Sequence, residues 1–342
     1  MKGVWTLAEQ HDGALKAVSF ELLSWGRSLA DKVQGKLYSI LIGSGFMEEK
    51  LKELIRRGAD EVIVVEDKEL GFFCTENHSA VLETLIRDYE PEIVIAAATS
   101  MGRTLMPYTA VKIHAGLTAD CTGLDIEEET GLLLQTRPAI GGNIMASIKT
   151  PLHKPQMATV RPRSSPIPVE DPKRKGVLTW FSLDSTLPNG RRFPALKKGR
   201  TLVKGCRREE SGFANLEEAE LIIAGGRGLK KKENFGLLEE IALCLGGKVG
   251  ASRDAVDRGW ISYPHQVGLS GKTVSPRLYI GVGISGAIQH LAGIKTSETI
   301  VSINSDPDAH FHKLADVAIV GDAFEVLGEL RKRLGMSNER RK

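Results

Sequence analysis

Short apolar runs alternate with amphipathic helical patterns along the first 114 residues of the chain. Runs of this kind, rich in Val, Ile and Leu and bounded by polar or glycine residues, are typical of buried strands. The predicted strands are residues 3–8, 36–43, 61–65 and 92–98, and the predicted helices are residues 15–33, 48–57, 80–89 and 105–114. Repeated strand-then-helix order indicates a parallel sheet with helices on its faces.

The pattern changes after residue 117. Strand-like pieces, LLLQTRPA, MASIKT and MATVRP, are separated by Gly and Pro, and we expect them to extend the same sheet or to form a small ribbon beside it. From residue 162 onward, prolines and charges dominate, which predicts a connecting segment over residues 162–205. The sequence therefore indicates an amino-terminal domain over residues 1–205, including this connection, and a second domain over residues 206–342.

The second domain repeats the alternating pattern. Its predicted strands are residues 220–224, 248–251, 278–282, 299–304 and 317–320, and its predicted helices are residues 235–245, 286–292 and 324–334. The expected fold class is α/β, with two doubly wound parallel-sheet domains, the carboxy-terminal one Rossmann-like.

Composition narrows the classes of function. The 46 Lys and Arg residues nearly balance the 43 Asp and Glu residues, so nucleic acid is not an expected partner. No apolar stretch approaches the length of a membrane span, and the opening MKGVWTLAEQ lacks a signal core, so we expect no membrane insertion and a cytoplasmic location. The cysteines form no CxxC pair and the histidines are scattered, so no metal site is expected.

The segment LYIGVGISGAIQHLAG, residues 278–293, is a predicted strand that runs through a glycine-rich turn into a helix. The first amides of such a helix have no internal acceptor, and they suit the phosphate of a cofactor. The spacing is not GxGxxG, and a glycine-rich turn also occurs where an α/β protein packs tightly. Both interpretations stay open from this turn alone.

Ligands of doubly wound sheets bind beyond the carboxyl ends of the strands. The residues that follow the predicted strands of the second domain are Gly225–Gly228, Ser252 and Arg253, Gly283–His290, Asn304–Asp306, and Gly321 and Asp322. They combine guanidinium groups, free amides, hydroxyls and a carboxylate. Arginine fits phosphates and electron-rich heterocycles, so this edge is the expected cofactor site.

Several long motifs carry a resemblance to a known family. GGRG at residue 225, ASRDAVDRGW at 251, HQVGLSGKTVSPRLYIGVGISGAIQHLAG at 265 and VSINSDPDA at 301 resemble the alpha subunits of electron transfer flavoproteins. The first half agrees, with TSMGRTLMPYTAVKIHAGLTADCTGLD at 99 and RPAIGGNIMASIKTPLHKPQMATVRP at 137. The resemblance covers nearly the whole chain in order.

The resemblance implies an FAD-binding carboxy-terminal domain and a heterodimer with the electron transfer flavoprotein beta subunit. The implied cofactor contacts are Arg227, Ser252, Arg253, Val267, Gly268, Leu269, Ser270, Ser285, Gly286, Ala287, Ile288, Gln289, His290, Asn304, Asp322 and Ala323. The sequence departs from the family pattern at Leu269 and Ser270, where Gln and Thr are usual, so the role of the 269 side chain is in doubt. His310 and His312 have no assigned role.

Physical roles follow for some of these residues. Arg253 is the expected cation beside the reduced flavin, because Coulomb attraction grows as the dielectric falls. His290 is expected to donate toward the pyrimidine carbonyl end of the ring, and Ser270 to a ring nitrogen. Arg227 is better placed to contact the phosphates of the cofactor or the solvent side of the flavin.

The expected function is that of an electron carrier rather than an enzyme. It would accept electrons from acyl-CoA dehydrogenases of fatty acid beta-oxidation, or from NADH, and pass them to an acceptor oxidoreductase. One alternative is half of an electron-bifurcating, NADH-oxidising complex with a second FAD in the beta subunit. Another is a non-redox nucleotide-binding module, which predicts no bound flavin.

Overall fold

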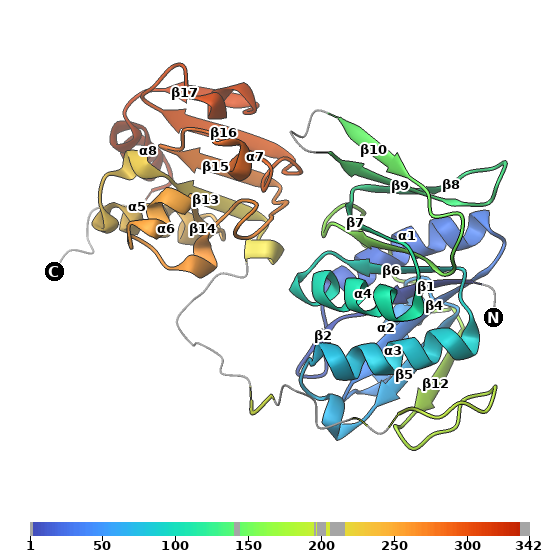
Figure 1. Ribbon diagram of the computed structural model, residues 1–342. Coiled ribbons are helices and arrows are strands. Elements are labelled where there is room, and N and C mark those ends of the chain that lie inside the picture. The colour runs from blue at the N-terminus through green and yellow to red at the C-terminus, as the bar shows by residue number, and fades with distance from the viewer. Residues whose placement is uncertain (1–2, 140–143, 195, 197–202, 206–215, 336–342) are drawn as a thin grey trace. The chain divides into compact units, whose positions relative to one another are not determined.

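The computed structural model describes residues 3–139, 144–194, 196, 203–205 and 216–335. The chain forms two compact units, residues 1–207 and residues 208–342 (Figure 1). Each unit contains a parallel sheet with helices packed on it, which confirms the predicted α/β class.

A seven-stranded sheet in the order β12-β5-β4-β1-β6-β11-β7 forms the centre of the first unit. Every neighbouring pair in it is parallel. The strands are β1 (Gly3–Leu7), β4 (Lys36–Gly43), β5 (Glu61–Glu66), β6 (Ile93–Ala97), β7 (Leu117–Cys121), β11 (Gln156–Val160) and β12 (Val177–Phe181). The chain first winds from β1 toward β5 and then returns to the other side of β1, so the winding reverses between β1 and β6.

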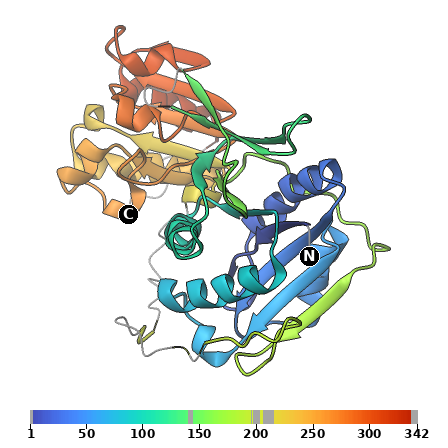
Figure 2. The ribbon, with the colours of Figure 1, turned by 45° about the vertical axis from the view of Figure 1, so that its right-hand side comes forward.

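Helices cover both faces of this sheet (Figures 1 and 2). Helices α1 (Ala17–Lys32) and α2 (Glu48–Arg56) pack on one face, and α3 (Thr75–Tyr89) and α4 (Ser100–Ile113) pack on the other. Alternate residues of each strand enter different clusters, so the strands are apolar on both sides, as a doubly covered parallel strand requires.

The strand-like pieces after residue 117 do both things that the sequence allowed. Strands β7 and β11 extend the main sheet. Strands β8 (Gly123–Ile126), β9 (Leu133–Pro138) and β10 (Met145–Ile148) form a separate antiparallel sheet in the order β10-β9-β8. A two-residue ladder, β2 (Gln10–His11) with β3 (Ala14–Leu15), follows β1.

The expected connecting segment, residues 162–205, needs correction in its first part. Strand β12 pairs with β5 along its whole length, and Arg174 binds Asp60 with an N–O distance of 2.7 Å. Leu187 and Phe193 are buried in the core beneath α3. The prolines flank β12 rather than interrupt it, so the apolar run can form an edge strand. The segment through Phe193 therefore belongs to the first unit.

The second unit has a five-stranded parallel sheet in the order β14-β13-β15-β16-β17. Its predicted strands are confirmed, with a shift of one residue in the first. The strands are β13 (Leu221–Gly225), β14 (Lys248–Ala251), β15 (Leu278–Val282), β16 (Thr299–Asn304) and β17 (Val317–Val320). The helices are α5 (Phe235–Cys244), α6 (Arg253–Asp257), α7 (Ile288–Leu291) and α8 (Ala323–Arg333). Helix α7 is shorter than the predicted 286–292.

Single turns of 3-10 helix complete the two units. They are η1 (Lys68–Leu70), η2 (Leu216–Glu218), η3 (Arg227–Leu229), η4 (Lys232–Asn234), η5 (Tyr263–His265) and η6 (His310–Lys313). Within the described residues, no helix is both long and apolar enough to cross a lipid bilayer.

The two faces of the second sheet are covered differently. Helices α5, α6 and α8 pack on one face around Ile223, Ile280 and Leu327. On the other face, Tyr279 of β15 and Phe311 of η6 are completely buried. Numbered along the chain, these strands lie in the order 2-1-3-4-5, so the winding reverses between β13 and β15. In open α/β sheets, ligands bind beyond the carboxyl ends of the strands at such a reversal point.

Candidate functional site

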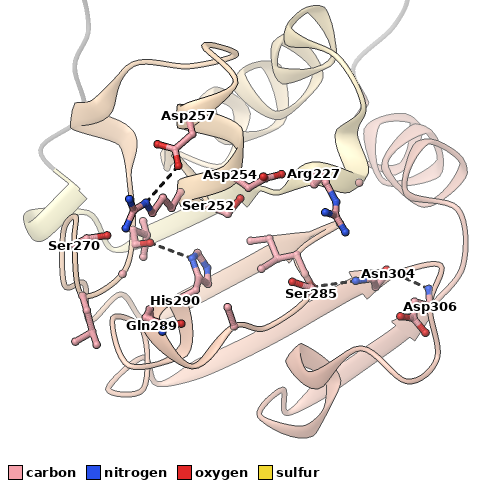
Figure 3. A pocket seen from close by; sticks show the side chains of 18 of the residues that line it. Arg227, Ser252, Asp254, Asp257, Ser270, Ser285, Gln289, His290, Asn304 and Asp306 are labelled. Atoms are coloured by element: carbon pink, nitrogen blue, oxygen red, sulfur yellow. Dashed lines mark hydrogen bonds and ion pairs between the residues drawn. The ribbon is translucent and has the colours of Figure 1, made fainter. Parts of the chain in front are cut away.

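A cavity of about 710 Å³ lies at the carboxyl end of the second sheet (Figure 3). Its walls come from the turns that follow β13, β14, β15 and β16, together with the loop of residues 266–272. The lining residues are Arg227, Gly228, Lys230, Ser252, Arg253, Asp254, Asp257, Val267, Gly268, Leu269, Ser270, Gly283, Ile284, Ser285, Ala287, Gln289, His290, Asn304 and Asp306. This volume is within the range of cofactor sites.

Glycines allow the turns after β13 and β15 to pack directly on each other. A Cβ atom on Gly226 would lie 2.3 Å from the carbonyl oxygen of Gly283, and one on Gly228 would lie 2.6 Å from the Gly283 Cα. Gly283 itself has a φ of +61°, a conformation that favours glycine. Tight packing, one of the two interpretations of this turn, thus explains part of the glycine pattern.

The same turn also supplies free hydrogen-bond donors. The backbone amides of residues 285–289 donate to no acceptor among the described residues. The turn is held from below, because Gly283 N donates to Ile303 O at 2.8 Å and Asn304 Nδ2 donates to Ile284 O at 3.0 Å. Successive unpartnered amides form an anion-binding concavity, so this turn fits a phosphate group as well.

Basic side chains approach the cavity from two neighbouring strands. Arg227 follows β13 and forms no ion pair with a described carboxylate, and Figure 3 shows its guanidinium directed toward the turn that bears Ser285. Arg253 begins α6, and its Nε lies 3.3 Å from the Asp257 carboxylate. That pair is solvent-exposed, so it holds the guanidinium only weakly. Lys230 adds a third positive charge to the wall.

Sequence reasoning did not include Lys230, Asp254 and Asp257 among the site residues. These three residues neither directly follow a predicted strand nor belong to the contacts that the resemblance implies. Asp257 was detectable, because the i, i+4 spacing places it on the same side of a helix as Arg253. Asp254 forms the corresponding pair with Arg258, at 3.0 Å.

Both ring nitrogens of His290 have partners within the protein, so this arrangement does not favour the expected donation to a ligand, which stays a prediction. Nδ1 of His290 lies 3.0 Å from the carbonyl oxygen of Val267, and its Nε2 lies 2.9 Å from the Tyr279 hydroxyl. The carbonyl can only accept, so Nδ1 carries the proton and Nε2 accepts from Tyr279. Burial lowers the pKa of His290 to about 4. The imidazole is therefore neutral at physiological pH.

The loop of residues 266–272 presents backbone and hydroxyl groups rather than an amide side chain. Leu269 donates its N–H to Gln289 O at 2.9 Å, while its side chain is exposed. Ser270 Oγ accepts from Gln266 Nε2 at 3.0 Å and keeps its own proton to donate. The expected hydroxyl donor at Ser270 is thus available, whereas the backbone N–H of Leu269 holds the loop against α7.

The cavity brings together most of the predicted contacts. Those that line it are Arg227, Ser252, Arg253, Val267, Gly268, Leu269, Ser270, Ser285, Ala287, Gln289, His290 and Asn304. Gly286, Ile288, Asp322 and Ala323 are not among the lining residues. Asp322 instead caps α8 by accepting from Phe324 N at 2.8 Å, Ala323 is buried against the core, and Gly286 packs on the backbone of η6.

No group of three or more His, Cys, Asp or Glu in the described part of the chain is arranged to hold a metal ion. The ring nitrogens of His312 are buried and have no described partner, and His312 does not line the cavity. Cys206 lies outside the described residues.

A flavodoxin-like strand order with a basic, amide-rich cavity at its reversal point is typical of doubly wound proteins that bind nucleotide cofactors. Residues 4–185 match the family described as "Electron transfer flavoprotein domain", and residues 215–295 match "Electron transfer flavoprotein FAD-binding domain". The chain belongs to the electron transfer flavoprotein alpha-subunit family. Members of this family are electron carriers rather than enzymes, which confirms the expected class.

Curated relatives match over nearly the full length. "Electron transfer flavoprotein subunit alpha" of Thermoanaerobacterium thermosaccharolyticum is 47% identical, with 95% of this chain and 96% of the relative covered. "Protein FixB" of Clostridium saccharobutylicum is 45% identical, with 96% and 95% covered. "Lactate dehydrogenase (NAD(+),ferredoxin) subunit LctC" of Acetobacterium woodii is 37% identical, with 96% of this chain and 76% of the relative covered.

Proposed function

We propose that this chain binds FAD in the cavity of its second unit and carries electrons as the alpha subunit of a heterodimer with a beta subunit. The observation that supports this most is the cavity at the β13–β15 reversal point, where basic side chains meet a row of unpartnered amides. Flavin nucleotides combine an anionic phosphate chain with a ring that becomes more negative on reduction. The site offers donors and positive charge for both parts.

The residues present fit the two ends of FAD. The amides of residues 285–289 and the Arg227 guanidinium would bind the diphosphate, because both are donors without a described acceptor. Arg253 and the Ser270 hydroxyl would face the ring. The Ser252 hydroxyl forms no capping hydrogen bond to α6, so it is also available. When bound, FAD supplies reversible electron transfer, which no side chain of the cavity provides.

The chain's own part is to bind the cofactor and place charge beside it. Arg253 would leave its exposed pair with Asp257 and turn toward the ring, at little cost because such pairs contribute little to stability. A guanidinium there favours the reduced, more negative ring. The neutral His290 would hold the wall formed by residues 266–272 and exclude water from that side.

The partners follow from the family. The predicted amino-terminal domain, residues 1–205, would pair with the beta subunit in the cytoplasm, and the predicted FAD domain, residues 206–342, would meet its redox partners transiently. Donors would be acyl-CoA dehydrogenases of fatty acid beta-oxidation or NADH, and the acceptor would be another oxidoreductase. The relative from Anaerotignum propionicum named "Acryloyl-CoA reductase electron transfer subunit beta", 38% identical, supports an acyl-CoA donor or acceptor.

A second candidate is half of an electron-bifurcating, NADH-oxidising complex in which the beta subunit holds another FAD. The similarity to the LctC subunit, whose printed name joins NAD⁺ and ferredoxin, favours this candidate. The described site is the same under both functions, because the difference lies in the beta subunit.

The test is to co-produce the chain with its beta subunit and to measure flavin content. We expect a yellow complex that releases FAD on denaturation. One FAD per heterodimer supports the simple carrier, and two support bifurcation. A complex that is colourless and takes up no added FAD would contradict the proposal and favour a non-redox nucleotide module.

A further inference from the structure

A buried chain of hydrogen bonds connects the centre of the second sheet to the cavity wall. The Tyr279 hydroxyl, on β15, lies 2.9 Å from Nε2 of His290, on α7. Nδ1 of the same ring lies 3.0 Å from the carbonyl oxygen of Val267. Tyr279 is fully buried and His290 is 6% exposed, so water does not compete for these bonds. Figure 3 shows the His290 ring reaching toward this wall.

The donors and acceptors of this chain can be arranged in one way when the imidazole is neutral. Val267 O can only accept, so Nδ1 is protonated and Nε2 has only a lone pair. Tyr279 then donates its proton to Nε2. If the imidazole were charged, both nitrogens would donate, and the buried Tyr279 proton would need another acceptor. The structure shows none for it among the described residues, and a buried unpaired donor is costly.

We propose that Tyr279 is a positioning residue for the cofactor site: its hydroxyl occupies Nε2 of His290, keeps the imidazole neutral, and fixes the Nδ1 proton on the loop of residues 266–272. This inference rests on the proposed flavin site. It assigns the positive charge of that site to the arginines and the lysine, and none of it to the histidine.

The groups around His290 agree with a neutral ring. The charged residues that line the same cavity are Arg227, Lys230, Arg253, Asp254, Asp257 and Asp306, and none of them is bonded to the imidazole. From η6, the neighbouring ring is the uncharged Phe311, with centroids 6.2 Å apart. Lys272, on the loop itself, lies 3.6 Å from the Glu217 carboxylate. Tyr279 and Val267 are therefore the groups that set the proton positions on His290.

The first measurement follows the ring nitrogens of His290 by ¹⁵N NMR in the full-length chain complexed with its beta subunit. The His290 signals are assigned from their loss in His290→Asn. We expect a protonated Nδ1 and an unprotonated Nε2 throughout the range from about pH 5 to 8, where an ordinary histidine titrates. A proton on Nε2, or a titration within this range, would overturn the inference whether or not flavin is bound.

The second measurement compares Tyr279→Phe with Tyr263→Phe. Both variants lose a tyrosine hydroxyl that supports the same loop, but Tyr263 donates to Ser270 O at 3.0 Å and does not touch His290. In Tyr279→Phe, we expect a second set of His290 signals from a rotated ring. We also expect the dissociation constant for flavin to be about tenfold higher in this variant than in the unaltered chain. Tyr263→Phe should leave the His290 signals unchanged.

The outcomes separate this inference from the proposed function. A colourless unaltered complex would contradict flavin binding but would leave the nitrogen assignment testable. A yellow complex in which Tyr279→Phe retains the same His290 signals and the same flavin affinity would contradict the positioning role alone.

Discussion

The two parallel sheets share a winding reversal next to their first strand, but the space beside it is used differently. In the first unit, Glu9 follows β1, is 1% exposed, and accepts hydrogen bonds from the Thr99 hydroxyl and from Lys16 Nζ at 3.2 Å. In the second unit, the turn after β13 carries Gly226 and Gly228, and the space beside it is the cavity. The two sheets are similar in topology, but the reversal point of the first is filled by a side chain and that of the second is open to a ligand.

The helices across the two reversal points differ in the same sense. Thr99 caps α4, because its Oγ accepts from Gly102 N at 3.1 Å. Helix α7 starts after Ala287 without a side-chain cap, and the amides before it have no described acceptor. A capped helix start is satisfied within the protein, whereas an uncapped one leaves its donors for a ligand. The turn residues, and not the strand order, therefore decide which unit can hold a cofactor.

The largest effect is expected for Gly226→Ala, which would separate the two turns of the second unit. The new methyl group would lie 2.3 Å from the Gly283 carbonyl oxygen, which is backbone and cannot rotate away. We expect a loss of about 3 kcal/mol in the free energy of unfolding and loss of bound flavin. Urea unfolding and flavin absorbance measure both.

Gly236→Ala is the matched control, because no atom within 4 Å would meet its new methyl group. It lies in α5, where alanine is the better helix former, so stability should be equal or higher by up to about 1 kcal/mol. Equal stability losses in both variants would show that the turn contact has no special role.

Glu9→Ala tests the closed reversal point of the first unit. It removes the acceptor of the Thr99 hydroxyl and the partner of Lys16, which is itself partly exposed and can turn to water. We expect a loss of about 2 kcal/mol in stability, near the contribution of hydrogen bonds to a charged group. Flavin content should stay the same, since the cavity belongs to the other unit. Denaturant unfolding monitored by circular dichroism checks the first expectation.

Asp31→Ala provides the comparison, since Asp31 also pairs with a basic side chain on α1 but is 65% exposed. An exposed i, i+4 pair of this kind contributes about 0.5 kcal/mol or less. If Glu9→Ala cost no more than Asp31→Ala, the buried carboxylate would not be what fills the first reversal point.

The strands could be predicted from the sequence because apolar runs and their polar or glycine boundaries are local features. Lys36–Gly43, Leu278–Val282 and Thr299–Asn304 match the predicted bounds. Strand β12 was hidden, because its apolar run lies between prolines and charges and becomes a strand only by pairing with β5. An edge strand of this kind depends on a partner that lies far away in the sequence.

The cavity wall could be predicted because parallel strands place their carboxyl ends at one edge. The proton positions of His290 could not, since the bond to Tyr279 depends on how α7 packs over β15. Asp322 was expected at the cofactor. It caps α8 and is not among the residues that line the cavity, and the sequence alone does not distinguish these two roles for an aspartate before a helix.

Arg253→Ala tests the charge at the open reversal point. Loss of the guanidinium should weaken FAD retention by about 10- to 30-fold and lower the flavin reduction potential, because the reduced ring loses a nearby cation. Equilibrium dialysis and redox titration of the heterodimer measure the two effects.

Arg277→Ala is the paired control, because Arg277 forms an exposed ion pair with Glu298, at 3.7 Å, and neither residue lines the cavity. It should leave both quantities unchanged. An unaltered potential in Arg253→Ala would remove Arg253 from the role proposed for it.

The smallest effect per pH unit concerns the buried histidines of the two units, His78 in α3 and His290 in α7. Burial lowers the pKa of each to about 4, although a backbone carbonyl, of Cys74 or of Val267, opposes the shift in part. The unfolded chain, with a histidine pKa near 6.5, binds protons more readily in acid than the folded chain does. Stability is therefore complete above about pH 6.5 and falls as the pH decreases toward 4, by on the order of 1 kcal/mol per pH unit for each histidine.

His78→Gln should remove the contribution of one histidine to the slope of stability against pH, because an amide does not titrate. The Gln amide can still donate to Cys74 O, which lies 3.1 Å from His78 Nδ1 in the unaltered chain. The measurement is the free energy of unfolding of the first unit, taken from its urea transition at several pH values between 4.5 and 7.5. Because His78 belongs to the first unit and does not line the cavity, its variant should change the slope while flavin content stays constant. A slope equal to that of the unaltered chain would show that His78 is protonated while folded, and that its burial does not exclude charge as the burial of His290 does.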